Sequence, residues 1–134
     1  MDRLNKKFDT ARNYVPKPEV TYEEEAKIGL IAFGSTDSAV VESRDQLKQN
    51  NIKTSYYRLR AMPFTNELRE FVQKHETIYV IEQNRDAQLK GLIRLELPDM
   101  AMKLKSILHY NGLPIDARSI TDAVLEQEKI ATKK

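Results

Sequence analysis

Four short strand-like runs, each followed at once by polar residues, constrain the fold of this chain more than any other feature. The runs are Ile28–Phe33, Thr54–Tyr57, Thr77–Ile81 and Lys105–Leu108. Ile28–Phe33 is apolar on both faces, which is typical of a central strand in a parallel sheet. Between the runs, apolar residues recur with helical period. Strands that alternate with helices at this spacing predict a three-layer α/β/α fold with a mostly parallel sheet and right-handed crossovers.

Individual elements follow from the same patterns. The expected strands are Glu19–Tyr22, which carries only a weak β signal, Lys27–Phe33, Ile52–Leu59, Thr77–Ile81 and Leu104–Leu108. The expected helices are one capped by Ser35, Thr36 or Asp37 and closed by Asn50-Asn51, one capped by Thr65, one capped by Asp86 with Leu89, Leu92 and Ile93 inward, and Asp116–Gln127. Asn111-Gly112 is expected to be a turn.

The two ends of the chain differ from its centre. Leu4, Phe8, Ala11 and Val15 fall on one helical stripe, and the prolines at 16 and 18 end any helix there. We expect residues 1–18 to be an amphipathic connector arm that docks on another domain or subunit, or equally well on its own domain. Residues 19–128 then form the α/β domain, and residues 129–134 form a basic tail.

Composition excludes several classes of function. The 134 residues suit one domain and include no cysteine, which rules out disulfides, thiolate catalysis and iron–sulfur ligation by this chain. The net charge is only +2 and the basic residues form no stripe, so nucleic-acid binding has little electrostatic support. No apolar run approaches the ~18 residues that a membrane span needs. We expect a cytoplasmic protein that binds neither nucleic acid nor membrane.

Polar residues after the strands mark the candidate site. Carboxyl ends of parallel strands meet at one edge of a sheet, where open α/β sheets place their binding crevice. The candidate interface or ligand residues at this edge are Gly34, Ser35, Thr36, Asp37, Arg58, Arg60, Pro63, Phe64, Glu82, Asn84, Arg85, Gln88 and His109.

Each of these groups has more than one interpretation. Gly34–Asp37 opens a helix and can hold an anion, although helix capping alone also explains it. Arg58 or Arg60 can clamp a carboxylate or phosphate; a salt bridge to Glu82 or a subunit contact is the favoured role. Glu82 has no neighbouring base or acid in sequence that would make it a general acid or base. The chain therefore has a polar carboxyl edge and no evident catalytic machinery.

Four segments resemble one family of enzymes. Ile31–Asp37, Tyr57–Phe64, Val80–Leu89 and Lys105–Pro114 are similar to the carboxyl-terminal part of the alpha subunit of 2-oxoacid:ferredoxin oxidoreductases, most closely the 2-oxoglutarate type. Leu59-Arg60, Pro63 and Glu82 more loosely resemble the carboxyl-terminal domain of transketolase-like enzymes. The resemblance implies a transketolase C-terminal-like fold: a five-stranded mixed sheet whose first strand, near Glu19–Tyr22, runs antiparallel to the rest.

The resemblance also implies a function for the whole assembly. Enzymes of this family decarboxylate a 2-oxoacid on thiamine diphosphate, pass electrons through iron–sulfur clusters to ferredoxin and release an acyl-CoA. Thiamine diphosphate, magnesium and the clusters are then carried by other domains or subunits, and this chain carries no cofactor. Many relatives have glycine where this chain has Ala87, which suggests either a turn with positive φ or a simple helix-propensity choice at that position.

Two main hypotheses follow. The leading one is a non-catalytic C-terminal domain, or a separately encoded piece, of such an alpha subunit, whose partners are the remaining domains and subunits and which meets ferredoxin and coenzyme A only through the complex. Its interdomain edge is expected at Arg58, Arg60, Phe64, Glu82, Asn84, Arg85 and Gln88. The alternative is a free-standing module that binds a small anion, nucleotide or coenzyme A at Gly34–Asp37. A small hydrolase built on His109 and Glu82 is a third hypothesis.

Overall fold

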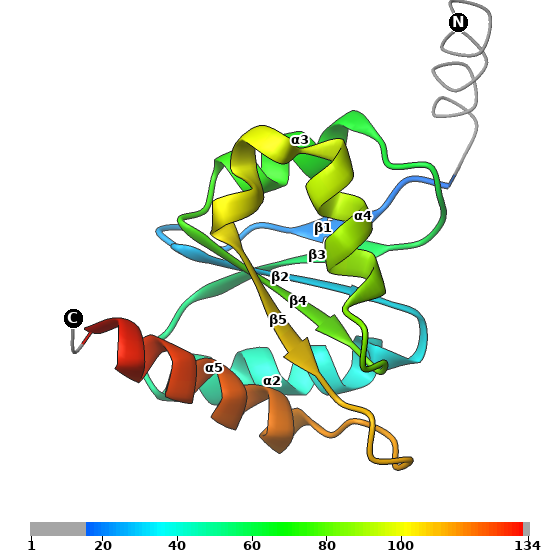
Figure 1. The fold of residues 1–134 in the computed structure, drawn as a ribbon. Helices are drawn as coiled ribbons and strands as arrows, with labels where there is room; N and C mark the ends of the chain where they lie inside the picture. The colour runs from blue at the N-terminus through cyan, green and yellow to red at the C-terminus, as the bar shows by residue number, and fades with distance from the viewer. Residues whose placement is uncertain (1–15, 133–134) are drawn as a thin grey trace, which may run out of the picture.

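The computed structural model describes residues 16–132, with side chains as far as Lys129. The connector arm expected over residues 1–18 lies outside the described residues, apart from residues 16–18. The elements are β1 (Glu19–Thr21), β2 (Ile28–Phe33), the 3₁₀ turn η1 (Gly34–Thr36), α2 (Asp37–Gln49), β3 (Thr54–Leu59), α3 (Asn66–Gln73), β4 (Thr77–Glu82), α4 (Gln88–Glu96), η2 (Pro98–Lys103), β5 (Leu104–Leu108) and α5 (Ala117–Thr132) (Figure 1).

The five strands form one mixed sheet in the order β1-β3-β2-β4-β5. β1 pairs with β3 antiparallel, with Glu19 opposite Arg58, and the other neighbouring strands pair in parallel. The predicted α/β class, the mixed five-stranded sheet and the antiparallel first strand are therefore confirmed. β2 lies at the centre because it is apolar on both faces, and its residues Ile28 to Ala32 are buried.

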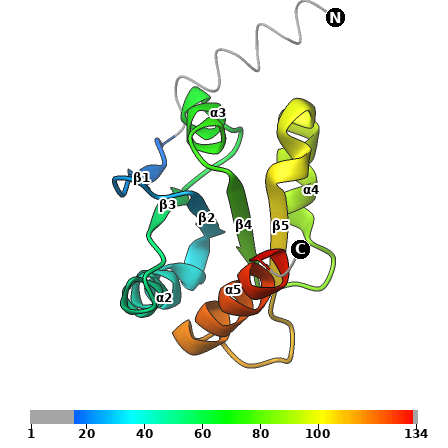
Figure 2. The same cartoon turned by 90° about the vertical axis from the view of Figure 1, so that its left-hand side faces the viewer.

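Helices cover both faces of the sheet (Figure 2). α2 and α5 pack together on one face, over a core that includes Leu30, Tyr56 and Tyr79. α3, α4 and η2 cover the other face, over the alternate residues of the same strands, which include Ile31 and Tyr57. The period of two along each strand thus supplies two separate cores.

Helix ends differ most from the predictions. Ser35, Thr36 and Thr65 make no side-chain capping bond, and Asp86 lies before the residue that caps α4. The helix predicted to end at Gln127 continues to Thr132, so it takes in the first residues of the predicted basic tail. The predicted helix end at Asn50-Asn51 and the predicted turn at Asn111-Gly112 are confirmed, since Asn51 and Gly112 both have positive φ, whereas β3 begins at Thr54 rather than at the predicted Ile52.

At Gly29 of β2, a side chain of α3 packs directly against the backbone of the sheet. A Cβ atom at Gly29 would lie 2.7 Å from Ile78 Cδ1 and 2.7 Å from Phe71 Cε1. We expect Gly29→Ala to lower the free energy of unfolding by about 1–3 kcal/mol through overpacking. The matched control is Gly91→Ala in α4, where nothing lies within 4 Å of the added methyl group, and this change should raise stability by about 0.5–1 kcal/mol. Urea unfolding of both variants measures the contrast, and equal effects would contradict the packing.

Buried tyrosines make the fold sensitive to alkali. Burial raises the pKa of Tyr57 to about 12, from an ordinary value of 10.0. The unfolded chain therefore releases this proton first, and stability should fall as pH rises from about 10 towards 12. The Tyr57 hydroxyl has no hydrogen-bond partner among the described residues. We expect Tyr57→Phe to change stability at pH 7 by no more than ~0.5 kcal/mol and to move the midpoint of alkaline unfolding to higher pH. The exposed Tyr110→Phe should leave that midpoint in place.

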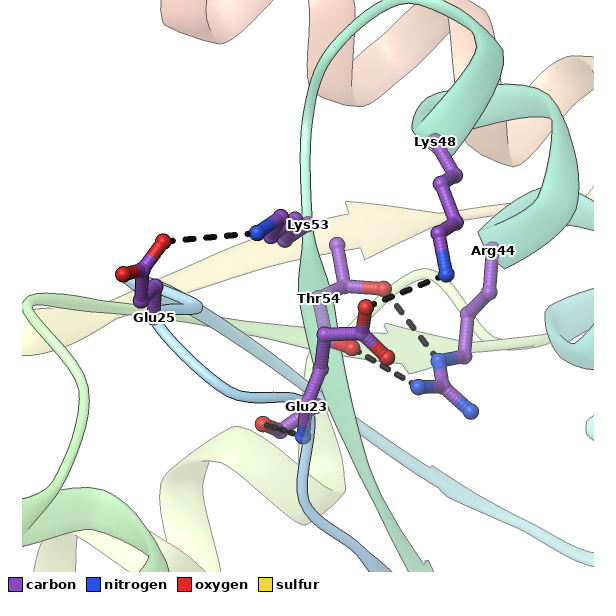
Figure 3. A network of polar contacts seen from close by, with 7 residues as sticks. Glu23, Glu25, Arg44, Lys48, Lys53 and Thr54 are labelled. Carbon is purple, nitrogen blue, oxygen red and sulfur yellow. Dashed lines mark hydrogen bonds and ion pairs between the residues drawn. The ribbon is translucent and has the colours of Figure 1, made fainter.

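The amino ends of the strands are held together internally (Figure 3). The Glu23 amide donates to Ser55 Oγ at 3.0 Å, and the Glu23 carboxylate pairs with Lys48 of α2 at 3.2 Å. Arg44, also from α2, donates to the Thr54 carbonyl at 2.7 Å. These contacts tie the loop after β1 to β3 and α2. Charged groups at this end of the sheet therefore find partners within the domain.

Candidate functional site

A crevice lies at the carboxyl ends of the three central strands. Its volume is about 430 Å³. After β2 the chain crosses to β3 on one side, and after β4 it crosses to β5 on the other. Open α/β sheets form their binding crevice where the connections diverge in this way. The lining residues are Phe33, Gly34, Ser35, Thr36, Leu59, Met62, Ile81, Glu82, Gln83, Asn84, Gln88, Leu89 and Leu92.

Glu82 caps α4 from the end of β4. The residue is only 3% exposed. Its Oε1 accepts hydrogen bonds from the Leu89 amide at 2.6 Å and from Asn84 Nδ2 at 2.9 Å, and its Oε2 accepts one from the Lys90 amide at 3.1 Å. A carboxylate at a helix amino terminus satisfies free amides and interacts favourably with the helix dipole. These bonds explain why a charged group is buried here, and the expected salt bridge from Arg58 or Arg60 to Glu82 is wrong.

Asn84 organises the turn between Glu82 and α4. Its Oδ1 accepts from the Asp86 amide at 3.2 Å and from the Gln88 amide at 3.4 Å. The predicted cap, Asp86, is exposed and its carboxylate lies 3.7 Å from Arg85 Nε. The prediction that Asp86 caps α4 is wrong because Glu82, at the end of β4, accepts the hydrogen bonds of the Leu89 and Lys90 amides instead.

Ala87 carries the strain of this turn. It has φ 52° and ψ 46°, the left-handed region, so the turn does require a positive φ. A non-glycine residue there costs about 1–2 kcal/mol. We expect Ala87→Gly to raise the free energy of unfolding by about 0.5–1 kcal/mol, after the greater entropy of glycine in the unfolded chain. Ala123→Gly, within α5, should instead lower stability by about 1 kcal/mol. Chemical denaturation distinguishes the two signs, and a loss of stability in both variants would contradict this assignment.

The segment after β2 is held by neighbouring side chains. Gln83 Nε2 donates to Ser35 Oγ at 3.3 Å and to Thr36 Oγ1 at 3.1 Å. Asp37 Oδ1 accepts from the Tyr56 hydroxyl at 2.9 Å and lies 3.6 Å from Arg58 Nε. The expected side-chain caps in this segment are therefore wrong. Its polar groups instead join the ends of β2, β3 and β4.

The structure separates the remaining candidate residues. Arg58 pairs with Glu19 across the β1–β3 ladder at 3.2 Å, and neither Arg58 nor Arg60 lines the crevice. Phe64 is buried in the core beside α3, while Pro63 follows a cis peptide bond and is half-buried. Of the predicted set, the crevice brings together Gly34, Ser35, Thr36, Glu82, Asn84 and Gln88. Asp37 and Arg85 lie outside it.

Neither histidine is arranged for catalysis. His109 Nε2 lies 2.9 Å from the Leu113 carbonyl, within the turn after β5. His75 is buried, its Nδ1 lies 2.6 Å from the Phe71 carbonyl, and burial lowers its pKa. Glu82, the proposed partner of His109 in a hydrolase, uses both carboxylate oxygens to cap α4. The described residues give no support to the hydrolase hypothesis.

Exposed apolar side chains at the rim were missed by sequence reasoning. Phe33, Met62 and Leu92 line the crevice with 54%, 45% and 45% of their surface exposed, and Leu95 on the next turn of α4 is 81% exposed. We call these four residues the apolar face. Leu92 was expected to point inward, and Phe33 closes an apolar run, so both patterns suggested core positions. Leu92 and Leu95 also line a second hollow on α4, next to the crevice.

The lining of the crevice contains few ionisable side chains, which limits the ligands that it can bind. None of the lining residues is a lysine or an arginine, and its one ionisable side chain is Glu82. Over residues 16–132, no group of three or more His, Asp or Glu side chains is placed to hold a metal ion. In the same part of the chain, no helix is long and apolar enough to cross a membrane. The crevice suits an apolar group flanked by hydrogen-bonding atoms better than an anion.

Comparison with known proteins adds the wider context. No family model matches the chain. The chain is 27% identical over 132 residues to the alpha subunit of 2-oxoacid:ferredoxin oxidoreductase 2 from Aeropyrum pernix, covering 92% of this chain and 20% of the relative. It is similar to a 2-oxoglutarate:ferredoxin oxidoreductase from Magnetococcus marinus, solved with 2-oxoglutarate, coenzyme A and succinyl-CoA bound, at TM-score 0.76 and 27% identity, covering 92% of this chain and 22% of that one.

A third match, at low sequence identity, supports the fold but no further assignment. A split-gene transketolase, solved as an inactive beta4 tetramer, matches at TM-score 0.65 and 16% identity, over 81% of this chain and 40% of that one. The predicted transketolase C-terminal-like fold is confirmed. Over most of its length the chain is homologous to part of 2-oxoacid:ferredoxin oxidoreductase alpha subunits, and it spans about a fifth of the length of the Aeropyrum relative.

Proposed function

We propose that this chain is a non-catalytic domain of a 2-oxoacid:ferredoxin oxidoreductase alpha subunit and that it contacts the neighbouring domains or subunits through the apolar face. The homology to a fraction of such alpha subunits supports the assignment. The observation that carries it is that Phe33, Met62 and Leu92 are exposed in the lining of one open crevice, and that Leu95 is exposed in the neighbouring hollow on α4. Clustered exposed apolar side chains mark interaction sites in soluble proteins.

The two ends of the sheet support this choice of surface. At the amino ends, charged groups pair within the domain, as Glu23 does with Lys48. At the carboxyl ends, large apolar side chains remain open to solvent while the polar groups beneath them are satisfied. Aromatic residues and methionine are enriched in protein interfaces. A partner that covers this rim removes apolar area from water without leaving Glu82 or Gln83 unpaired.

The reaction of the complete enzyme is assigned to other parts of it. We propose that the complex oxidatively decarboxylates a 2-oxoacid such as 2-oxoglutarate to an acyl-CoA, in the cytoplasm, with ferredoxin as acceptor. Thiamine diphosphate, magnesium and iron–sulfur clusters would then be bound elsewhere. The residues of this chain do not fit an iron–sulfur cluster, because it has no cysteine, and residues 16–132 offer no cluster of three metal-ligating side chains for a metal ion.

Reconstitution tests this function. The purified chain is mixed with the remaining domains and subunits of the oxidoreductase from the same source, prepared without this domain, and 2-oxoacid-dependent reduction of ferredoxin is measured. We expect no turnover from the chain alone and recovered turnover from the mixture. Turnover by the isolated chain, or no effect of adding it, would overturn the proposal.

The alternative function is a free-standing module that binds a small anion, and ligand titration distinguishes it from the proposed non-catalytic domain. Coenzyme A and nucleotides carry phosphates that need cationic partners or free helix amides. The crevice lining has no lysine or arginine, and Asp37 occupies the first turn of α2. Calorimetric titration of the chain with coenzyme A and with a nucleoside triphosphate should release no binding heat. Saturable heat with either ligand would favour the binding module.

A further inference from the structure

Methionine carries all of the sulfur in this chain, because the sequence contains no cysteine. The structure describes three methionines, and their surroundings differ. Met100 belongs to the core on the α3 side of the sheet and is 8% exposed, whereas Met102, in η2, is 99% exposed and lines neither the crevice nor the second hollow. Met62 lines the crevice and is 45% exposed. Solvent therefore reaches two of these sulfur-bearing side chains, and of the two only Met62 belongs to the apolar face.

An exposed thioether reacts with a peroxide without any further group from the protein. Hydrogen peroxide transfers one oxygen atom to the sulfur: an S=O bond forms, the O–O bond breaks and the sulfur gives up two electrons. The proton of the transferred oxygen passes to the departing hydroxide, which leaves as water. The product, methionine sulfoxide, is polar and chiral, and methionine sulfoxide reductases convert it back to methionine. The open crevice gives the peroxide access to Met62.

The surroundings of Met62 suit a thioether better than a sulfoxide. The crevice lining contains no lysine or arginine that could pair with the sulfoxide oxygen. Two amide groups of the lining already donate within the domain, Gln83 Nε2 to two hydroxyl groups and Asn84 Nδ2 to Glu82. In the free domain, water satisfies the sulfoxide oxygen. A partner that covers the rim removes this water, so oxidation adds the cost of burying a strong acceptor to the cost of binding.

We infer that Met62 is an oxidation site and that its sulfoxide weakens the contact between the apolar face and a partner. The inference rests on the proposed function, because it needs a partner that covers this rim. The free chain is the form that reacts, and a bound partner shields the sulfur. Oxidation of an exposed methionine adds a polar oxygen to an interface that depends on apolar contact, and reduction of the sulfoxide restores that interface.

Oxidation mapping of the purified chain tests the access of peroxide to Met62. The chain is treated with hydrogen peroxide, and the sulfoxide at each methionine is measured by proteolysis and mass spectrometry. We expect Met62 and Met102 to be oxidised well before Met100. When the remaining domains and subunits of the oxidoreductase are bound, Met62 should be protected and Met102 should react as before. A Met62 that reacts no faster than Met100, or equally fast with and without the bound parts, would overturn the inference.

The affinity of the oxidised chain tests the effect of the sulfoxide. Peroxide treatment should weaken binding to the remaining oxidoreductase parts at least ~10-fold, a loss of about 1.4 kcal/mol. Treatment with methionine sulfoxide reductases should restore the affinity. The urea midpoint of the treated chain should not move, because Met62 is half exposed in the free domain. Met62→Leu lacks the sulfur but keeps Met100 and Met102, so peroxide should not change the affinity that this variant has before treatment.

Two further substitutions make the test independent of peroxide. Met62→Gln places a polar amide of similar length at the rim and should weaken binding, whereas the matched control Met102→Gln should not. Equal affinity of treated and untreated chains, full affinity of Met62→Gln, or an equal loss in treated Met62→Leu would overturn the inference and leave the proposed function standing. An untreated chain that does not bind the remaining parts would overturn the proposed function, and the inference with it.

Discussion

Replacement of Glu82 by alanine is expected to lower the free energy of unfolding by about 3 kcal/mol, because hydrogen bonds to a charged acceptor contribute about 1.5–3 kcal/mol each and a helix cap about 0.5–2 kcal/mol. The variant loses both carboxylate oxygens, which accept from the Leu89 and Lys90 amides and from Asn84. The first turn of α4 is then left without its cap. Urea unfolding measures the loss, and faster amide exchange at Leu89 and Lys90 should accompany it.

Two variants control for charge and for position. Glu82→Gln keeps one acceptor oxygen but places an amide group against a helix amide, so about half of the loss is expected. Asp86→Ala removes an exposed carboxylate close to the same helix and should change stability by no more than ~0.5 kcal/mol. If Glu82→Ala were as mild as Asp86→Ala, the capping role of Glu82 would be refuted.

A charge on the apolar face is expected to break assembly without unfolding the domain. Leu95→Asp should weaken binding to the remaining oxidoreductase parts at least ~30-fold, the loss that corresponds to a hot spot of about 2 kcal/mol. Leu95 is exposed on α4, so stability should stay within ~0.5 kcal/mol of the unmodified chain. Titration of the partner parts with each variant gives the affinities.

Val41→Asp is the matched control for that experiment. Val41 is also an exposed aliphatic residue on a helix, but it belongs to α2, on the opposite face of the sheet. We expect its affinity for the partner parts to be unchanged. Equal losses in Val41→Asp and Leu95→Asp would indicate a general effect of added charge and would remove the apolar face from the interface.

The architecture was predictable from the sequence because burial of a strand or of a helix face repeats apolar residues at short, characteristic spacings. β2 is apolar at every position from Ile28 to Phe33, and α3 places Leu68, Phe71 and Val72 on one side. Such patterns specify which faces must be covered, and hence the layers. The antiparallel pairing of β1 came from the family resemblance, since three residues carry too little pattern to indicate a direction.

The site was predicted only in outline because its contacts join distant parts of the chain. The carboxyl edge was correctly expected to collect polar side chains. Glu82 caps a helix whose amides lie seven and eight residues ahead, and Gln83 reaches Ser35 and Thr36 after another strand. Capping patterns in sequence cover only about three residues, so they pointed to Asp86 and Ser35 instead. The exposure of Phe33 and Leu92 likewise depends on tertiary packing, which a local sequence pattern does not contain.

The most direct test of the central claim is to identify the proteins that associate with this chain in its source cells. An antibody against α5 is used to follow the polypeptide through gentle fractionation of its source cells, and the proteins that travel with it are identified. The account predicts that the chain migrates in a large assembly together with thiamine-diphosphate and iron–sulfur subunits, and with 2-oxoacid:ferredoxin oxidoreductase activity. A polypeptide of 15.5 kDa that migrates alone, without such companions, would contradict the account.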